Sequence, residues 1–574
     1  MKRVFNEKQP NNLMRHISLF IFLALSAVAF AQPKDAWKAV ATLTTYAADG
    51  TQIYSGNVFF TDDAGSVIAP YTPFVKAVRA EVTDSKGHRH QVTRILGASE
   101  NYGFVRAATD ARATDHLVPI AEGGGAARAG SRLFAVGHQR NKKETPLAVT
   151  VQKAEPYDAA MFYITSLPAD AKYAGLPLID ATGRVVAVVS EHGGEALDVR
   201  LATALKIEAA TALSAELRAL PIPKALPEGE TEAMKYVTLL DAIDPTAALT
   251  AMGDFVTAYL HSPAGFTTRA ARYAAMKRYA EAETDYATAL RLAEESEQSA
   301  TEQMSPDAVH YAFSRAVYAA ALSDSTSSTL GWTLGRALQE ADAAYSAKPQ
   351  PLYAMQQGAC LYAMERYADA YAKYEEVNAS ELASDETFFT AVLALERAGG
   401  DTAKIMALLD KVISLQKRPY DQRAASYFFE RAQRLFAYGQ YRRAAIDYDE
   451  FERIIGPRNL NDNFYFLREQ AELQAHMYQQ ALDDIQSAIL SAPAERKPYY
   501  QTEEALIYLT CGEYQSAKES ALAAYAAIPR HIPLLRILGV ACGELGDKAA
   551  ARRYLTEAQQ QGDDSVVSLL EKYQ

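Results

Sequence analysis

The sequence predicts a multidomain protein in which an all-β region is followed by a long all-α array. Between residues 37 and about 200, short β-branched and aromatic runs alternate with Gly, Asp and Pro turns. Beyond residue 230 these strand signals end, and helical periodicity rich in Ala, Leu, Glu and Tyr continues to the C-terminus. At 574 residues the chain also exceeds what one hydrophobic core usually organises, so we expect several domain-sized units.

The first segment, residues 1–31, is predicted to be a secretory signal peptide. Basic residues precede an apolar run from Ile17 to Phe30, and Ala29 to Ala31 form a small-x-small cleavage signature. The apolar run is shorter than the ~20 residues needed to cross a bilayer, which argues against a retained anchor. We therefore expect a periplasmic or secreted bacterial protein that is not membrane-spanning after signal cleavage.

Charge and motif content exclude several functions. Cleavage would remove four basic residues and one acidic residue, changing the formal net charge from −12 to −15. So acidic a chain is a poor match for nucleic acid or anionic membrane, which attract basic surfaces. No phosphate-loop motif and no metal-ligand spacing occurs, so we expect no cofactor and no metal. An odd number of cysteines argues against a disulfide framework and predicts buried free thiols, namely Cys360, Cys511 and Cys542.

The all-β region, residues 36–201, carries the landmarks of a known peptidase fold. Residues 56–60 resemble a Gly-x-Gly-Phe strand, and 65–68 lead into the position of a histidine loop. Residues 130–137 resemble the strand after an inter-barrel connection, and 174–186 the segment that carries a nucleophile. In order and spacing, these landmarks resemble trypsin-like serine peptidases, particularly the HtrA-like group. The resemblance implies two β-barrels and a Ser-His-Asp triad.

The residues at the triad positions cannot perform that chemistry. Thr72 stands where the family has its histidine, Asn101 where it has its aspartate, and Ala174 where it has its serine. Lys172 replaces the glycine that helps to shape the oxyanion hole. Threonine is no base near neutral pH, an amide cannot stabilise an imidazolium as a carboxylate does, and alanine is no nucleophile. The resemblance therefore implies a catalytically inactive pseudopeptidase.

The alternative is an active HtrA-like serine endopeptidase that uses displaced residues. Neither available hydroxyl is followed by the glycines and proline of a nucleophile motif, and we expect all the available histidines to be surface residues. The hydroxyls are those of Ser131 and Ser190, and the histidines are His88, His90, His138 and His192.

Residues 202–230 are predicted to form a helix and a Pro-rich linker. Apolar residues follow helical spacing from Ala202 to Leu220, and three prolines at positions 221, 223 and 227 then interrupt the pattern. We place the domain boundary here and expect few contacts to cross it.

Residues 231–574 contain a self-similar helical pattern. Five of six copies begin with an aromatic residue, and all six have an alanine three positions later; four positions after that stands a bulky residue, except for Ala521 in the copy at Tyr514. The copies begin at Tyr279, Tyr367, Tyr441, Tyr478 and Tyr514, with Lys548 in place of the aromatic residue in the last. A small residue stands nine positions before most of these, with Glu469 as the exception. Segments 231–262, 305–349 and 385–415 are predicted to be divergent copies.

This pattern resembles the tetratricopeptide repeat, in which small residues let two antiparallel helices approach closely. The predicted fold class is therefore an all-β trypsin-like double β-barrel followed by an all-α tetratricopeptide-repeat solenoid. In such arrays the first helix of each pair lines a concave face. The family's positions carry over to Met355, Tyr362, Phe429, Gln433, Phe436, Phe466, Gln470, Leu506 and Leu509.

This mostly apolar lining predicts a groove for an amphipathic helix or an extended segment of a protein partner. The opposing interpretation is that the array's own packing, or the barrel, covers these residues. We therefore expect a protein-binding scaffold with an inactive barrel. Two rivals remain: the active endopeptidase whose repeats deliver substrate, and a pseudopeptidase that captures peptides in its old cleft while the repeats oligomerise it.

Overall fold

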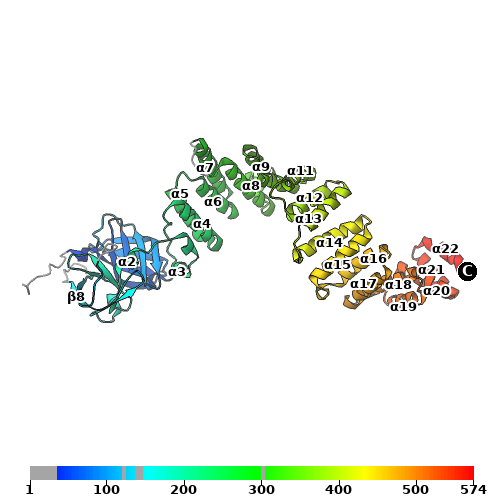
Figure 1. Cartoon of the computed structure of the whole chain (residues 1–574), viewed down its shortest axis with the longest axis horizontal. Helices are drawn as coiled ribbons and strands as arrows, with labels where there is room; N and C mark the ends of the chain where they lie inside the picture. Colours follow the sequence, from blue (N-terminus) through cyan, green and yellow to red (C-terminus); the bar gives the residue numbers. More distant parts are fainter. Residues whose placement is uncertain (1–34, 119–124, 138–145, 299–303) are drawn as a thin grey trace, which may run out of the picture. The chain divides into compact units, whose positions relative to one another are not determined.

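The computed structural model describes residues 35–118, 125–137, 146–298 and 304–574. The predicted signal peptide and His138 lie outside the described residues. Strands occupy the N-terminal part of the chain and helices the rest, and the chain divides into two compact units, residues 1–309 and 310–574 (Figure 1). Among the described residues, no helix is long and apolar enough to cross a membrane.

Six antiparallel strands close the first barrel in the order β1-β2-β3-β6-β5-β4. Pairing between β1 and β4, with Thr42 opposite Thr83, completes the circle. Inward-facing side chains such as those of Leu43 and Phe60 are buried in its core, as the alternation of a closed sheet requires. The strands are β1 (Val40–Tyr46), β2 (Gln52–Phe60), β3 (Ser66–Pro70), β4 (Arg79–Thr83), β5 (Arg89–Ser99) and β6 (Phe104–Thr109).

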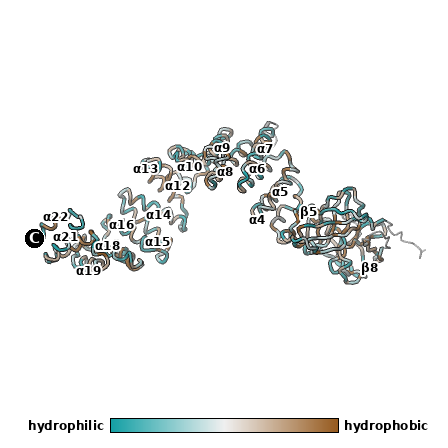
Figure 2. Tube along the Cα trace, turned by 180° about the vertical axis from the view of Figure 1, so that it is seen from behind, coloured by the Kyte–Doolittle hydropathy of each residue, from teal (hydrophilic) through white to brown (hydrophobic). Residues whose placement is uncertain are grey.

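A second barrel follows, with the order β10-β11-β12-β9-β8-β7, and it closes where Leu178 pairs with Ala135. All five residues of β11 are buried, which explains their uninterrupted apolar sequence. The double-barrel prediction is thus confirmed. The strands are β7 (Arg132–Ala135), β8 (Leu147–Tyr157), β9 (Ala160–Thr165), β10 (Pro177–Ile179), β11 (Val185–Val189) and β12 (Glu195–Asp198). Figure 2 shows hydrophobic residues along the strands of the barrel region.

The Pro-rich segment differs from the loosely packed linker that we expected. Strand β4 covers β5 only at residues 89–91, so β5 extends beyond its neighbour. The segment satisfies the exposed backbone of β5, because Ile95 N–H donates to the Pro223 carbonyl and Ala225 N–H donates to the Ile95 carbonyl, both at 2.8 Å. Proline lacks a donor but keeps its carbonyl acceptor, so a Pro-rich segment can still pair in this way.

Two helices after this segment complete the core of the first barrel. They are α4 (Glu230–Ile243) and α5 (Pro245–Ala258), and their Tyr236 and Phe255 side chains are buried with Ile95 in one apolar cluster. Arg94 also forms a bidentate ion pair with Asp254 on α5. Short elements bridge the sequence between β12 and α4, namely α2 (Val199–Thr203), η4 (Ala209–Leu213) and α3 (Ala215–Arg218). Packing is therefore continuous across the predicted domain boundary.

This continuity predicts the outcome of limited proteolysis. Trypsin should cleave slowly after Lys224, because the backbone around it is hydrogen-bonded to β5 and Ile222 is buried. Truncating a shared core ring with Phe255→Ala should cost about 3–5 kcal/mol and accelerate that cleavage. Mass spectrometry of timed digests gives the measurement. Early separation of the native chain at Lys224 would show that the barrel and α4 do not form one folded core.

The remaining helices form the predicted pairs, and each sequence motif begins the second helix of its pair. Helices with this start are α7 (Tyr279–Gln298), α11 (Tyr367–Asn378), α15 (Tyr441–Ile455), α17 (Tyr478–Ser491), α19 (Tyr514–Tyr525) and α21 (Lys548–Gln560). Their partners are α6 (Pro263–Ala275), α10 (Pro351–Ala363), α14 (Gln422–Ala437), α16 (Asp462–Gln474), α18 (Lys497–Thr510) and α20 (Ile532–Glu544). The divergent segments are also helical, with α8 (Pro306–Ser323), α9 (Leu334–Ala347), α12 (Asp385–Arg397) and α13 (Thr402–Ser414), and α22 (Val567–Lys572) ends the array.

Small residues allow the close approach of paired helices. A Cβ atom on Gly358 would lie 3.1 Å from the Tyr374 ring, and one on Gly539 would lie 2.5 Å from Cγ of Leu555. Glu469 occupies the equivalent position of its repeat and is 0% exposed. Cys360 and Cys542 are buried, as expected, but Cys511 is exposed because it caps the C-terminus of α18.

Candidate functional site

Thr72, at the histidine position, is held by a carboxylate from the other barrel. Its backbone N–H donates to Oε1 of Glu191 at 2.7 Å, and its hydroxyl donates to Oε2 at 2.6 Å. Thr72 begins the turn η2 (Thr72–Phe74) after β3, whereas Glu191 follows β11. A hydroxyl that donates its proton to a carboxylate cannot take a proton from a nucleophile. The threonine therefore contributes a contact between barrels where the family has a base.

Asn101, at the aspartate position, lies exposed in the turn between β5 and β6. The same turn contacts the Thr72 segment, because Tyr71 N–H donates to the Gly103 carbonyl at 2.9 Å. Tyr102 fixes the turn to the second barrel by donating its hydroxyl to Asp158 at 2.8 Å. The structure thus brings the segments of two degenerate triad positions together.

Ala174, at the serine position, is only 4% exposed and lies against the first barrel. The Asn57 amide of β2 donates to the carbonyls of Lys172 at 2.9 Å and Ala174 at 3.2 Å. The next residue, Gly175, has φ +73°, and a Cβ there would lie 2.5 Å from the Asn57 carbonyl oxygen and 3.1 Å from Pro70 Cδ. Only glycine fits this position, so its place in the sequence landmark has a structural reason.

The backbone donors that the family uses for an oxyanion hole are occupied here. The resemblance to trypsin-like peptidases places these donors at the backbone N–H groups of Lys172 and Ala174. The turn η3 (Ala171–Tyr173) redirects both: Lys172 N–H donates to the Asp170 side chain, and Ala174 N–H donates to the Ala171 carbonyl, each at 3.0 Å. An oxyanion hole needs donors that point at developing charge, and these two are engaged within the turn.

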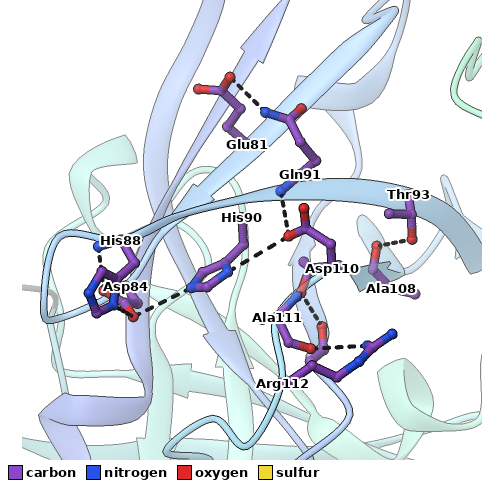
Figure 3. Close-up of polar contacts among 12 residues, drawn as sticks. Glu81, Asp84, His88, His90, Gln91, Thr93, Ala108, Asp110, Ala111 and Arg112 are labelled. Carbon is purple, nitrogen blue, oxygen red and sulfur yellow. Dashed lines mark hydrogen bonds and ion pairs between the residues drawn. The ribbon is translucent and has the colours of Figure 1, made fainter.

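Two of the histidines proposed as displaced bases, His88 and His90, lie beside aspartates (Figure 3). His88 Nδ1 lies 3.1 Å from Asp84 Oδ2, while His90 lies between Asp84 at 3.4 Å and Asp110 at 3.7 Å. His90 is a correction to the expectation of surface histidines, because its side chain is 20% exposed and its ring packs edge-on against Phe60. The pleat of β5 turns it inward. Among the described residues, no group of His, Cys, Asp and Glu could hold a metal ion.

The hydroxyls proposed as displaced nucleophiles have no histidine bonded to them in the described ranges. Ser131 accepts a hydrogen bond from Arg128 N–H at 2.9 Å and so stabilises a turn. The Ser190 hydroxyl is buried, and no hydrogen-bond partner lies near it among the described residues. His192, two residues beyond, is exposed.

The predicted concave-face residues include a set of packed rings and an open row, which is formed by Gln433, Gln470 and Leu506. Gln433 and Leu506 are exposed, and the other seven of the nine are half-buried. The half-buried residues are Met355, Tyr362, Phe429, Phe436, Phe466, Gln470 and Leu509. Gln433, Gln470 and Leu506 each follow the position of close helix approach, so they occupy one equivalent position in three successive repeats.

Packing contacts account for the aromatic members of this set. The Phe429 ring lies 5.1 Å from that of Phe451, between centroids. Phe436 lies 5.4 Å from Tyr441 of its own repeat, and Phe466 lies 5.4 Å from Tyr500. These rings therefore contribute to solenoid packing. The open row remains as the accessible part of the predicted face.

Three repeats share a bidentate ion pair that sequence reasoning missed. In each, an arginine on the first helix binds an aspartate sixteen residues later on the second, at 2.6–2.8 Å. The arginine comes just before the position of close approach, and the aspartate comes just before the bulky motif residue. The constant spacing of these two residues within the repeat could have predicted the ion pair from the sequence. The pairs are Arg269 with Asp285, Arg431 with Asp447 and Arg468 with Asp484.

The pair at Arg468 lies in a buried cluster with excess negative charge. Arg468 also binds Asp449 at 2.9 Å and Glu452 at 2.6 Å. On the same helix, burial raises the pKa of Glu469 to about 8 and that of Glu472 to about 9, and each keeps one carboxyl oxygen without a partner. Because these folded-state pKa values exceed the usual value, the contribution of these two groups to stability is largest at low pH and is lost as pH rises from about 4.5 to about 8–9.

The two parts of the chain define its fold class: two closed six-stranded antiparallel barrels followed by an array of paired helices. No family model matches the chain, and neither does any curated protein. One similar solved structure is the HtrA-type protease AlgW with a decapeptide, at 15% identity and a TM-score of 0.26, covering 31% of this chain and 66% of that one.

Two other solved structures are also similar to part of the chain. YrrB, described as a TPR protein with an unusual peptide-binding site, shares 15% identity at a TM-score of 0.29, over 35% of this chain and 98% of its own. A serine endoprotease from Yersinia pestis shares 16% identity at a TM-score of 0.24, over 29% of this chain and 60% of its own. The chain thus spans about two thirds or less of the length of these proteases.

Proposed function

We propose that this chain is a periplasmic or secreted scaffold whose trypsin-like domain is catalytically inactive and whose repeats bind a protein partner. The observation that carries the first part is the occupied oxyanion position. Lys172 and Ala174 N–H groups are both engaged within η3, and Ala174 brings no nucleophile to the same place. Chemistry and geometry therefore agree, so the active endopeptidase has less support than the inactive barrel.

The second part of the proposal rests on the open row of the repeats. Gln433 and Leu506 are exposed on equivalent positions of first helices, and Gln470 lies at the same position between them. Gln470 is held in place because its amide donates to Glu469 at 2.7 Å. A row of this kind, flanked by half-buried rings, suits an amphipathic helix that lays one face along successive repeats.

Site-specific photocrosslinking tests the binding role in cells. Benzoylphenylalanine at Gln433 and at Leu506 should each give one discrete crosslinked species of the same partner in the periplasmic fraction. Ile446 is the matched control, since it is exposed but lies on α15, the second helix of its pair. Mass spectrometry of the adduct identifies the partner and its contacting segment.

Equal crosslinking from Ile446, or none from either row position, would contradict binding by the concave face. The variant Phe436→Ala separates the two roles of the rings. It should lower the melting temperature, because Phe436 packs on Tyr441, whereas Gln433→Ala should reduce crosslinking at Leu506 without changing the thermal transition.

A further inference from the structure

A cavity of about 450 Å³ lies where the Pro-rich segment meets α4 and α5. Its volume falls in the range of small-molecule sites, which is roughly 300–1,000 Å³. Tyr236 and Leu240 of α4 and Ala251 of α5 form an apolar wall of the cavity. Arg218 of α3 and Lys224 of the Pro-rich segment also line it. None of its lining residues is a degenerate triad position or a member of the repeat row.

In the described part of the chain, Lys224 and Arg218 form no ion pair with a carboxylate, although Asp244 interacts electrostatically with Lys224. Lys224 Nζ donates to the Leu220 carbonyl, and Arg218 Nε donates to the Ser214 carbonyl at 3.4 Å. By contrast, Asp254 receives both nitrogens of Arg94, and Asp244 caps α5 by accepting Ala247 N–H at 3.0 Å. The lining therefore offers positive charge beside an apolar wall.

We propose that this cavity binds a small carboxylate with an apolar body, the carboxylate lying at Lys224 and the body against α4 and α5. Burial lowers the pKa of Lys224 to about 8 because it disfavours the charged ammonium form. An anion bound beside Lys224 would stabilise that charged form. The other titratable groups facing the cavity are Arg218, Tyr236, Asp244 and Asp254. A carboxylate partner satisfies the lysine in the way that buried charges require.

Calorimetric titration of the full chain with octanoate provides the test, with 1-octanol as the uncharged probe. Octanoate should bind at pH 7 more tightly than octanol, and its affinity should fall as pH rises above about 8. The variant Lys224→Met should weaken octanoate at least about tenfold, as loss of a charge-assisted hydrogen bond implies, while leaving octanol unchanged. Lys235→Met, on the exposed face of α4 and paired with Glu232, is the matched control and should bind octanoate normally.

A chemical footprint keeps the proposal testable if Lys224→Met fails to fold. Octanoate should protect Lys224, and not Lys235, from acetylation by an N-hydroxysuccinimide ester, as read by mass spectrometry. Acetyl-Leu-Leu and its C-terminal amide then distinguish the source of the carboxylate: binding of the acid alone would identify a peptide C-terminus, and binding of octanoate alone a free aliphatic acid. Absence of binding by both acids, or octanoate binding that Lys224→Met leaves unchanged, would overturn the proposal.

Discussion

The protein without its first 31 residues should cleave neither casein nor fluorogenic peptides, and a fluorophosphonate probe should label none of its serines. The variant Ala174→Ser should remain equally inert. Its new hydroxyl would face no base, because Thr72 donates to Glu191, and no oxyanion hole, because Lys172 and Ala174 N–H are engaged. A working triad contributes about 10⁶-fold to kcat in a serine peptidase, so the two outcomes are far apart.

An active HtrA-type peptidase assayed in parallel shows that probe and substrate are competent. The combined variant Thr72→His, Asn101→Asp and Ala174→Ser tests whether restoring the triad side chains is enough for activity. If the engaged amides alone block catalysis, this triple variant should stay inactive until Lys172→Gly and Asp170→Ala release the turn. Stoichiometric labelling of any serine in the unaltered chain, Ser190 included, would refute the inactive barrel.

The proposed loss of the triad follows from residue types, but the engagement of the backbone donors within η3 could not be predicted from the sequence. Thr72, Asn101 and Ala174 are visible in the sequence because their chemistry is fixed by their side chains. The direction of a backbone N–H depends on local dihedral angles instead. Asp170 caps the 3₁₀ turn that engages the donors. The spacing of residues in the sequence does not predict this turn.

Long-range pairing explains the contacts across the Pro-rich segment, which were not expected from the sequence. Three prolines indicated a linker, and local propensity supports that interpretation. The segment is nevertheless held because β5 is longer than β4 and leaves the backbone of Ile95 unpaired, a feature that depends on strand lengths elsewhere in the barrel. Repeats were predicted more fully, since each motif tyrosine marks the start of a helix and its contacts are local.

The remaining large effect concerns the charge cluster of the repeats. Replacing Arg468 with methionine should destabilise the array by about 3–5 kcal/mol, because removing one partner of a buried ion pair leaves the other charges uncompensated. Arg468 is 9% exposed, and its loss would strand Asp484, Asp449 and Glu452. Hydrogen exchange in α16 and α17 measures the effect locally, which suits a solenoid whose repeats unfold through neighbours.

Two comparisons make the result decisive. Arg453→Met removes an arginine from an exposed pair with Glu450 on α15, so it should cost less than about 0.5 kcal/mol. The Arg468 variant should also be more destabilised at pH 8.5 than at pH 5.5. Asp484 and Asp449, like Glu469 and Glu472, have raised folded-state pKa values and so take up protons more readily at the lower pH, which relieves the repulsion in the cluster. Equal losses in the two variants, or a loss independent of pH, would mean that solvent rather than Arg468 compensates this cluster.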